Sequence, residues 1–304
     1  MRASVTTLCA SSPSAIGPSD AIPGILDQVI TKDLDAREEA LAEIMREASE
    51  LARRLYLHPE SLGVKLKGKQ DYITVADGEV ERLIVRRLGE RFPDDAVLGE
   101  EGGRSGGAAG SGDAVWIIDP IDGTANFAHR IPHFSISIGF LSGGEPQLAA
   151  LGAPMYGEVF RARRGRGAFC NERRMRVSAT TDIQRAIVEL GWSVRRPARA
   201  HTALLERVLA SGATFLRAGT GAPGLAYVAD GRTHGYCELH INAWDVAAGL
   251  LLVQEAGGWT NDFFAGDALE KGNPVLACTP GLREALVAIT GVGQATEKLE
   301  RRVT

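Results

Sequence analysis

The residues with the clearest potential for chemistry lie within one run of twelve, residues 116–127. An apolar stretch delivers Asp119, a proline stiffens the backbone, and Asp122 follows three residues later. Gly123 and Thr124 then open a turn whose backbone N–H groups could face an anion. Two carboxylates one short turn apart, beside such amides, suit a divalent cation that holds a phosphate.

Three further acids stand in suggestive places. Glu100 and Glu101 follow a short apolar segment, and Asp245 comes directly after Trp244 at the start of an apolar helix. Each has an ordinary explanation as a solvated, turn-forming or helix-capping residue. Together they indicate convergence, because close carboxylates repel one another unless a cation such as Mg²⁺ coordinates them.

Hydrophobic periodicity predicts the elements that must position these acids. A helix over 245–256, apolar nearly all round, should be buried and should end at Gly257. The other helices are expected over 34–56, 80–88, 200–210, 222–230 and 281–289. A short extended segment is expected over 67–76, and strands at 97–98, 114–119, 134–141, 147–151, 158–162, 167–170, 235–239, 259–263 and 275–278.

Two stretches have an unusual composition. Residues 102–112 hold six glycines, which predicts a mobile loop, either a flexible flap or, in preference, a tolerated insertion. The expected hairpin near 158–176 is rich in arginine. We interpret these residues as a solvated or subunit-facing surface, with phosphate or nucleic-acid contact as the alternative; they are Arg161, Arg163, Arg164, Arg166, Arg173, Arg174 and Arg176.

Composition narrows the class of protein. The 304 residues are 44% hydrophobic and 24% charged, with a formal net charge of −4, so nothing draws the whole chain toward nucleic acid or an anionic membrane. The four cysteines have no metal or redox spacing, which favours reduced thiols in a cytoplasmic protein. The histidines share no metal spacing, and we interpret them as structural or surface residues. No apolar stretch is long enough to span a bilayer. Residues 1–21 predict a disordered tail.

With these motifs the sequence resembles the inositol monophosphatase family of metal-dependent phosphatases. The resemblance covers roughly residues 35–290, and its Asp-Pro-Ile-Asp-Gly-Thr core is highly specific. The matching segments, in family order, are Asp71–Asp77, Gly99–Glu101, Trp116–Phe127, Gly219–Ala222 and Trp244–Gly249.

The resemblance implies a layered α/β fold, an αβαβα sandwich, and commonly a homodimer. We expect a phosphatase domain over 31–292, with subdomains of about 31–180 and 181–292. Residues 1–30 and 293–304 are expected to be tails.

The resemblance also implies the site. Two or three Mg²⁺ ions would be held by Glu100, Asp119, Asp122, Asp245 and the Ile121 carbonyl. Asp77 and Thr124 would orient the attacking water, with Glu100 beside them among the catalytic residues, although Asp77 could simply cap the helix that follows it. The amides of Gly123 and Thr124 would bind phosphate, and Gly221 and Glu238 would contact the rest of the substrate.

Departures from the family pattern bear on the substrate. Ala125 replaces a frequent threonine, a change that we expect the chemistry to tolerate. Residues 219–223 differ from the usual segment, and Gly224 takes a commonly acidic position. These residues line the substrate side in relatives.

The predicted reaction is hydrolysis of a small sugar or polyol phosphate, with inositol 1-phosphate as the leading substrate. Fructose-1,6-bisphosphatase, histidinol-phosphatase and 3′-phosphonucleotide phosphatase activities are the enzymatic alternatives. A non-catalytic role that binds RNA or protein through the arginine-rich hairpin is the alternative of another class. Membrane and nucleic-acid partners are not expected.

Overall fold

The computed structural model describes residues 23–58, 65–68, 71–107 and 114–294, so most of both predicted tails lies outside the described residues. The chain divides into two compact units, Met1–Arg37 and Glu38–Thr304. Helix α1 (Pro23–Leu57) begins earlier than predicted. In the first unit, Asp33 and Arg37 form an ion pair one helical turn apart.

The larger sheet of the second unit has eight strands and carries the Asp119–Asp122 motif. Only the β3–β5 pair in it is parallel, so the sheet is mixed. Its strands in spatial order are β10 (Arg173–Arg174), β9 (Gly167–Cys170), β8 (Glu158–Arg163), β7 (Glu145–Ala153), β6 (Ser135–Ser142), β5 (Ala114–Asp122), β3 (Ala96–Gly99) and β4 (Gly103–Gly106).

The smaller sheet has five strands and is also mixed, because β12, β11 and β13 run parallel while β15 is antiparallel to β13 and β14. Strands β11 and β12 were missing from the sequence prediction. In spatial order the strands are β12 (Thr214–Leu216), β11 (Ile187–Leu190), β13 (Gly235–Ile241), β15 (Asn273–Cys278) and β14 (Trp259–Thr260).

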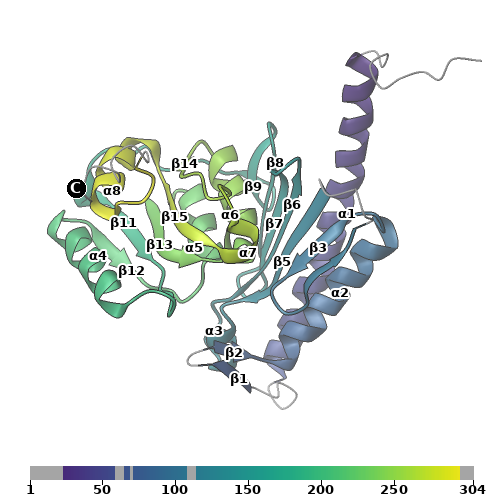
Figure 1. Cartoon of the computed structure of the whole chain (residues 1–304), viewed down its shortest axis with the longest axis horizontal. Coiled ribbons are helices and arrows are strands. Elements are labelled where there is room, and N and C mark those ends of the chain that lie inside the picture. Colours follow the sequence, from purple (N-terminus) through teal and green to yellow (C-terminus); the bar gives the residue numbers. More distant parts are fainter. Residues whose placement is uncertain (1–22, 59–64, 69–70, 108–113, 295–304) are drawn as a thin grey trace, which may run out of the picture. The chain divides into compact units, whose positions relative to one another are not determined.

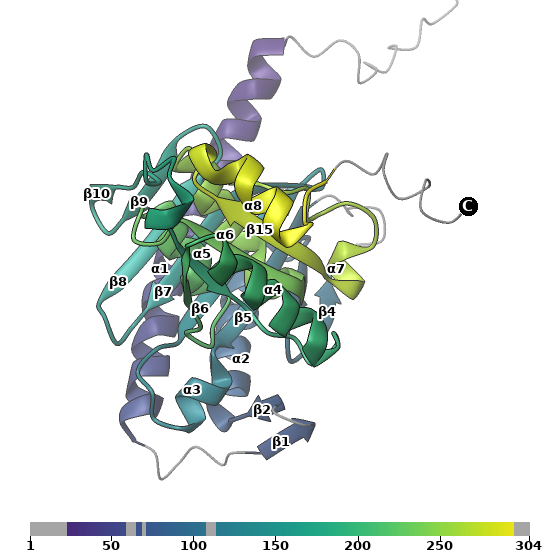
Figure 2. The same ribbon diagram turned by 90° about the vertical axis from the view of Figure 1, so that its left-hand side faces the viewer.

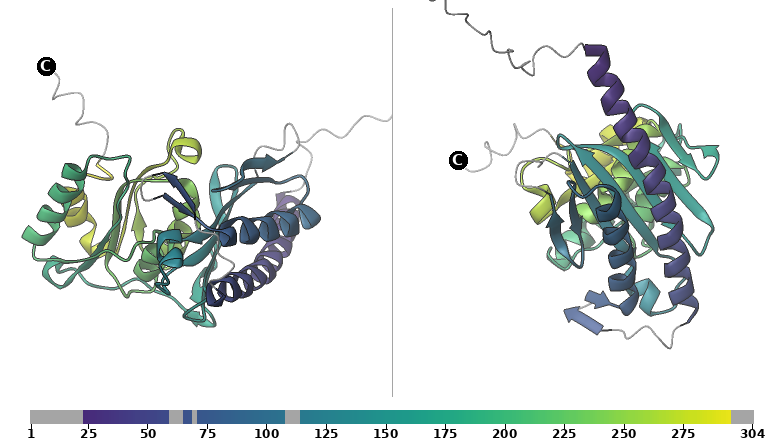
Figure 3. Two further views of the ribbon diagram at one scale, coloured as in Figure 1. Left: turned by 90° about the horizontal axis from the view of Figure 1, so that it is seen from below. Right: turned by 90° about the vertical axis from the view of Figure 1, so that its right-hand side faces the viewer.

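Helices and sheets alternate in layers, which confirms the predicted layered α/β fold (Figures 1 and 3). Helices α4 (Ala198–Ala210) and α8 (Arg283–Thr290) cover the outer face of the smaller sheet, and α5 (Ala222–Ala229) and α6 (Ala243–Glu255) lie between the two sheets. Helix α2 (Val75–Arg91) and residues 38–57 of α1 cover the other face of the larger sheet.

Short elements complete the unit. Strands β1 (Lys65–Gly68) and β2 (Asp71–Ile73) form a hairpin beside α3 (Thr124–Ala128), as Figure 2 shows. Among the described residues, the remaining short elements are α7 (Ala268–Lys271) and two 3₁₀ turns, at Ile183–Arg185 and Pro280–Leu282. No helix in the described part of the chain combines the length and apolarity needed to cross a bilayer.

The glycine-rich stretch differs from its prediction. Residues 103–106 form β4, which pairs antiparallel with β3 at the edge of the larger sheet, instead of a mobile loop. Glycine lowers strand propensity, but the backbone groups of β3 are open to pairing at that edge. Tertiary context therefore overrides local propensity here. Residues 108–113 lie outside the described part of the chain.

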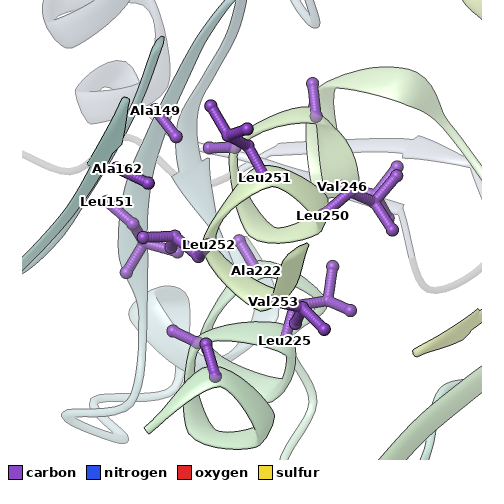
Figure 4. Close-up of a cluster of buried hydrophobic side chains, with 14 of the residues drawn as sticks. Ala149, Leu151, Ala162, Ala222, Leu225, Val246, Leu250, Leu251, Leu252 and Val253 are labelled. Carbon is purple, nitrogen blue, oxygen red and sulfur yellow. The ribbon is translucent and has the colours of Figure 1, made fainter. Parts of the chain in front are cut away.

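The core centres on α6, the helix predicted to be buried. Leu251 and Leu252 point from α6 toward Ala149, Leu151 and Ala162 on the larger sheet (Figure 4). Residues 246–253 of α6 are buried. Both the larger sheet and α5 bury apolar surface against α6. This helix is therefore a rigid base for the residues at its start.

We predict that Leu251→Ala lowers the free energy of unfolding by about 2–5 kcal/mol, because a fully buried leucine leaves a cavity when truncated. Urea unfolding at pH 7 measures the change. Leu209→Ala is the matched control, since this leucine of α4 is 49% exposed and should lose less than about 0.5 kcal/mol. Equal losses in the two variants would contradict the central position of α6.

Candidate metal centre and active site

The motif at the end of β5 brings two carboxylates to one side of the sheet. In a regular strand, residues three apart point to opposite faces. Here the pairing of β5 with β6 shifts register between Asp119 and Asp122, across a segment that contains Pro120. Proline cannot donate to the ladder and favours such irregularities. The Asp119 carboxylate accepts a hydrogen bond from the amide of Ile121 at 3.0 Å.

Asp122 is anchored by the start of α5. Its carboxylate accepts hydrogen bonds from the amides of Gly221 at 3.0 Å and Ala222 at 2.6 Å. Gly221 was predicted to bind substrate. The structure places it in the lining of the cavity described below, with its N–H engaged by Asp122.

Asp245 is presented by the first turn of α6. Asn242 and Asp245 form a capping box, in which the Asp245 carboxylate accepts from the amide of Asn242 at 3.0 Å. Asp245 therefore caps α6 and at the same time lies close to the other acids. Carboxylate oxygens of Asp119, Asp122 and Asp245 all lie within 4.8 Å of one another.

Glu100 adds a fourth negative charge. Its amide donates to the carbonyl of Ile118 at 3.2 Å, which fixes the residue beside the end of β5. Glu100 is outside the closest set of three acids, but its charge acts on two of them. Burial, followed by repulsion from Glu100, raises the pKa of both Asp119 and Asp245 well above the ordinary value.

The electrostatics of this cluster fit a hard divalent cation. Burial raises the pKa of Asp122 to about 6, even though the Gly221 and Ala222 amides lower it. Closely spaced oxygen donors with uncompensated like charge are the environment that a cation such as Mg²⁺ stabilises. The donor set therefore suits a metal centre.

Asp77 and Thr124 meet beside this cluster. Asp77 forms a capping box with Thr74 at the start of α2, and its other oxygen accepts from the Thr124 hydroxyl at 3.1 Å. The Thr124 hydroxyl also lies 2.9 Å from the carbonyl oxygen of Ile121. Burial raises the pKa of Asp77, although hydrogen bonds from Thr74 and Thr124 oppose the rise. Asp77 is thus both a cap and a partner of Thr124.

The turn after β5 requires a glycine. Gly123 has φ +93° at the start of α3, a left-handed conformation that favours glycine. A Cβ at this position would also lie 2.5 Å from the Thr220 side chain. The Gly123-Thr124 turn is therefore packed closely against residues 219–221.

A cavity of about 780 Å³ opens beside the acids, within the size range of small-molecule sites. Glu100, Asp122 and Asp245 line it, as do residues 191–195, 219–221 and 240–242, together with Ala125, Arg217, Glu238 and Trp244. The cavity therefore joins the acid cluster to segments of the smaller sheet.

Glu238, which was predicted to contact substrate, lies on β13 and lines this cavity. It is 7% exposed, and its carboxylate accepts from the Tyr236 hydroxyl at 2.9 Å. Burial raises its pKa to about 7. A Cβ on Gly191 would lie 1.9 Å from a Glu238 oxygen, so only glycine at position 191 leaves room for this carboxylate.

Sequence reasoning missed several residues around the cavity. Tyr236 orients Glu238, and Arg195, Arg217 and His240 contribute to the lining. Glu189 is buried on β11, where its carboxylate accepts from the amide of Ala218 at 3.2 Å, and burial raises its pKa to about 7. The short apolar segment 187–190, followed by a glycine, was the signal that could have indicated this strand. Four residues are too few for hydrophobic periodicity to identify a strand.

Comparisons with known proteins agree with this geometry. A family model described as the inositol monophosphatase family matches residues 31–292. A curated protein of Pseudomonas aeruginosa named Nus factor SuhB is 38% identical over 249 residues, covering 80% of this chain and 92% of that protein. The Nus factor SuhB of Xylella fastidiosa is 42% identical over 211 residues, covering 69% and 75% respectively.

Solved structures show the same fold. The extragenic suppressor protein suhB from Bartonella henselae has a TM-score of 0.77 and 34% identity, covering 84% of this chain and 98% of that one. An IMPase of Thermotoga maritima has a TM-score of 0.73 and 32% identity, covering 84% and 96%. These similarities confirm the family and the fold predicted from the motifs.

We predict that Asp119→Asn stabilises the metal-free protein at pH 8 by about 1–2 kcal/mol. The raised pKa of Asp119 means that its contribution to stability is present below pH 3.8 and is lost as pH rises through the folded-state value. At pH 8 the burial and the like charges that oppose ionisation of Asp119 therefore cost the fold stability, and asparagine removes that cost while its oxygen can still accept from the Ile121 amide.

Urea unfolding in chelator at pH 8 and at pH 5 measures this effect, which should be smaller at pH 5. Asp262→Asn, on an exposed residue, is the control and should change little at either pH. Loss of stability in Asp119→Asn at pH 8 would show that the cluster is not under electrostatic repulsion.

Proposed function

We propose that this chain, which belongs to the inositol monophosphatase family, hydrolyses a small sugar or polyol phosphate with the help of Mg²⁺. The observation that carries the proposal is the close approach of Asp119, Asp122 and Asp245, with Glu100 beside them at the cavity. Inositol 1-phosphate is the leading substrate.

Glu100, Asp119, Asp122, Asp245 and the Ile121 carbonyl would hold the cations. When bound there, Mg²⁺ supplies Lewis acidity toward phosphoryl oxygens and lowers the pKa of water. A full set of hard oxygen donors favours Mg²⁺ over a softer metal, which would take thiolate or imidazole ligands.

The chain itself provides a route for the proton of the attacking water. Thr124 Oγ1 can accept that proton while its own proton passes to Asp77 Oδ1, 3.1 Å away. Asp77 is held for this by Thr74, whose amide and hydroxyl both donate to Asp77 Oδ2. The raised pKa of Asp77 strengthens it as an acceptor.

Other residues would bind the substrate. The Gly123 and Thr124 amides, at the left-handed turn, would hold phosphate oxygens. Glu238, fixed by Tyr236, would accept hydrogen bonds from substrate hydroxyl groups, with Gly221 packed close by. A carboxylate that accepts from hydroxyls suits a polyol or sugar, which favours inositol 1-phosphate over the phosphonucleotide and histidinol phosphate alternatives.

The name of the curated relatives, Nus factor SuhB, does not itself state a hydrolytic activity. A partner-binding role that needs no turnover is therefore the second candidate for this chain. A binding role alone gives no reason for the acids to cluster at a cavity, so we favour the phosphatase. The homodimer and the division near residue 180 remain predictions.

We predict Mg²⁺-dependent release of phosphate from inositol 1-phosphate, and a loss of at least about 10³-fold in kcat/KM for Asp245→Asn. The reason is that Asp245 is one of the three closest oxygen donors. A colorimetric phosphate assay measures the rates, and fructose 1,6-bisphosphate, histidinol phosphate and a 3′-phosphonucleotide complete the panel.

Asp262→Asn serves as the control for protein handling and should retain wild-type rates. Circular dichroism should show that Asp245→Asn stays folded. Turnover that persists in excess chelator would refute metal-dependent catalysis. Absence of turnover on every ester by the wild type would favour the partner-binding role.

A further inference from the structure

The turn that carries Glu100 is held from two sides. It consists of residues 100–102 and joins β3 to β4 at the edge of the larger sheet. The amide of Glu100 donates to the carbonyl of Ile118 on β5. The next amide along the chain, that of Glu101, donates to the carboxylate of Glu81 on α2 at 3.0 Å. The backbone is therefore fixed both before and after the Glu100 side chain.

The carboxylate of Glu81 is enclosed by this turn. Glu81 is 7% exposed, and a Cβ on Gly99 would lie 2.6 Å from one of its oxygens. A Cβ on Gly102 would lie 2.7 Å from the other oxygen. The turn can therefore close around the carboxylate only because both of these positions are glycine. Strand β4, which follows the turn, is exposed along its whole length and gives the turn little packing on that side.

Glu81 shares a face of α2 with a residue that the proposed mechanism already uses. It lies one helical turn after Asp77, so the two side chains lie on the same face, and both are buried. Asp77 contacts Thr124, whereas Glu81 contacts the turn that carries Glu100. Burying a carboxylate is costly unless hydrogen bonds satisfy it. A cost of this kind indicates that the turn needs to be held in one conformation.

We propose that Glu81 is a positioning residue for the metal centre. By accepting from the Glu101 amide, it fixes the turn so that the Glu100 carboxylate stays directed toward Asp119 and Asp245, on which its charge acts. Glu81 itself binds no metal in this account. The inference rests on the proposed function, because it concerns how firmly one ligand of the proposed Mg²⁺ site is held.

Two substitutions separate the reach of the Glu81 side chain from its charge. Glu81→Asp keeps the charge but shortens the side chain, so that the carboxylate no longer reaches the Glu101 amide. Glu81→Gln loses the charge but keeps an oxygen that can accept from that amide. Calorimetric titration of the metal-free protein with Mg²⁺ should show a dissociation constant about tenfold higher in Glu81→Asp, as expected when the support of a metal ligand is removed. In Glu81→Gln it should stay within about threefold of the wild-type value.

A double-mutant cycle tests whether Glu81 acts through Glu100. Glu100→Gln should itself weaken Mg²⁺ binding, and adding Glu81→Asp should weaken it by less than about twofold more, because the effects of coupled residues do not add. Glu79→Asp is the matched control, since this glutamate of α2 lines a groove with Leu51 of α1. It should bind Mg²⁺ as the wild type does. Circular dichroism should show that each variant stays folded.

Wild-type Mg²⁺ affinity in Glu81→Asp would overturn the inference and leave the metal site intact. So would a loss in Glu81→Gln as large as that in Glu81→Asp, since charge rather than reach would then decide the affinity. Additive losses in the double variant would also overturn it, because they would indicate an effect that does not pass through Glu100. Absence of Mg²⁺ binding by the wild type is a different result, which would overturn the proposed function itself.

Discussion

Repulsion among carboxylates that the fold forces together is the constraint around which this molecule is organised. Asp119 and Asp122 lie on β5 and Asp245 lies more than a hundred residues later in the sequence, yet their oxygens lie within 4.8 Å of one another. Burial raises the pKa of all three, and repulsion from neighbouring carboxylates adds to the rise at Asp119 and Asp245. A fold that keeps such an arrangement gives up stability in the absence of a counter-charge, and a divalent cation would supply that counter-charge.

Ordinary local structure holds each acid against this repulsion. The irregular pairing around Pro120 turns β5 so that both of its aspartates serve one site. Capping boxes place Asp77 and Asp245 at the starts of α2 and α6. Since α6 is buried between the two sheets, packing holds its first turn, and with it Asp245, next to the other acids. The features that cap helices and bend strands are therefore also the features that build the site.

Much of this was predictable from sequence because the acids sit next to strongly patterned elements. The periodicity of α6 and the apolar run of β5 gave both the elements and the residues at their ends. The sequence did not predict the short strands β11 and β4. The four residues of β11 and the glycine-rich β4 form strands because they pair with neighbouring strands. Glu189, Tyr236 and the two cavity arginines were missed for the same reason: their positions depend on tertiary packing, which no local pattern encodes.

The central claim, that the acid cluster is a Mg²⁺ site, is tested most directly by titrating the metal-free protein with Mg²⁺ in a calorimeter at pH 6.5. Repeating the titration in two buffers of different ionisation enthalpy gives the number of protons that Mg²⁺ binding releases. Because the clustered carboxyls have raised pKa values, Mg²⁺ binding should release protons, and Asp119→Asn should reduce both the affinity and the release. Absence of Mg²⁺ binding at millimolar concentration, or binding that Asp119→Asn leaves unchanged, would contradict it.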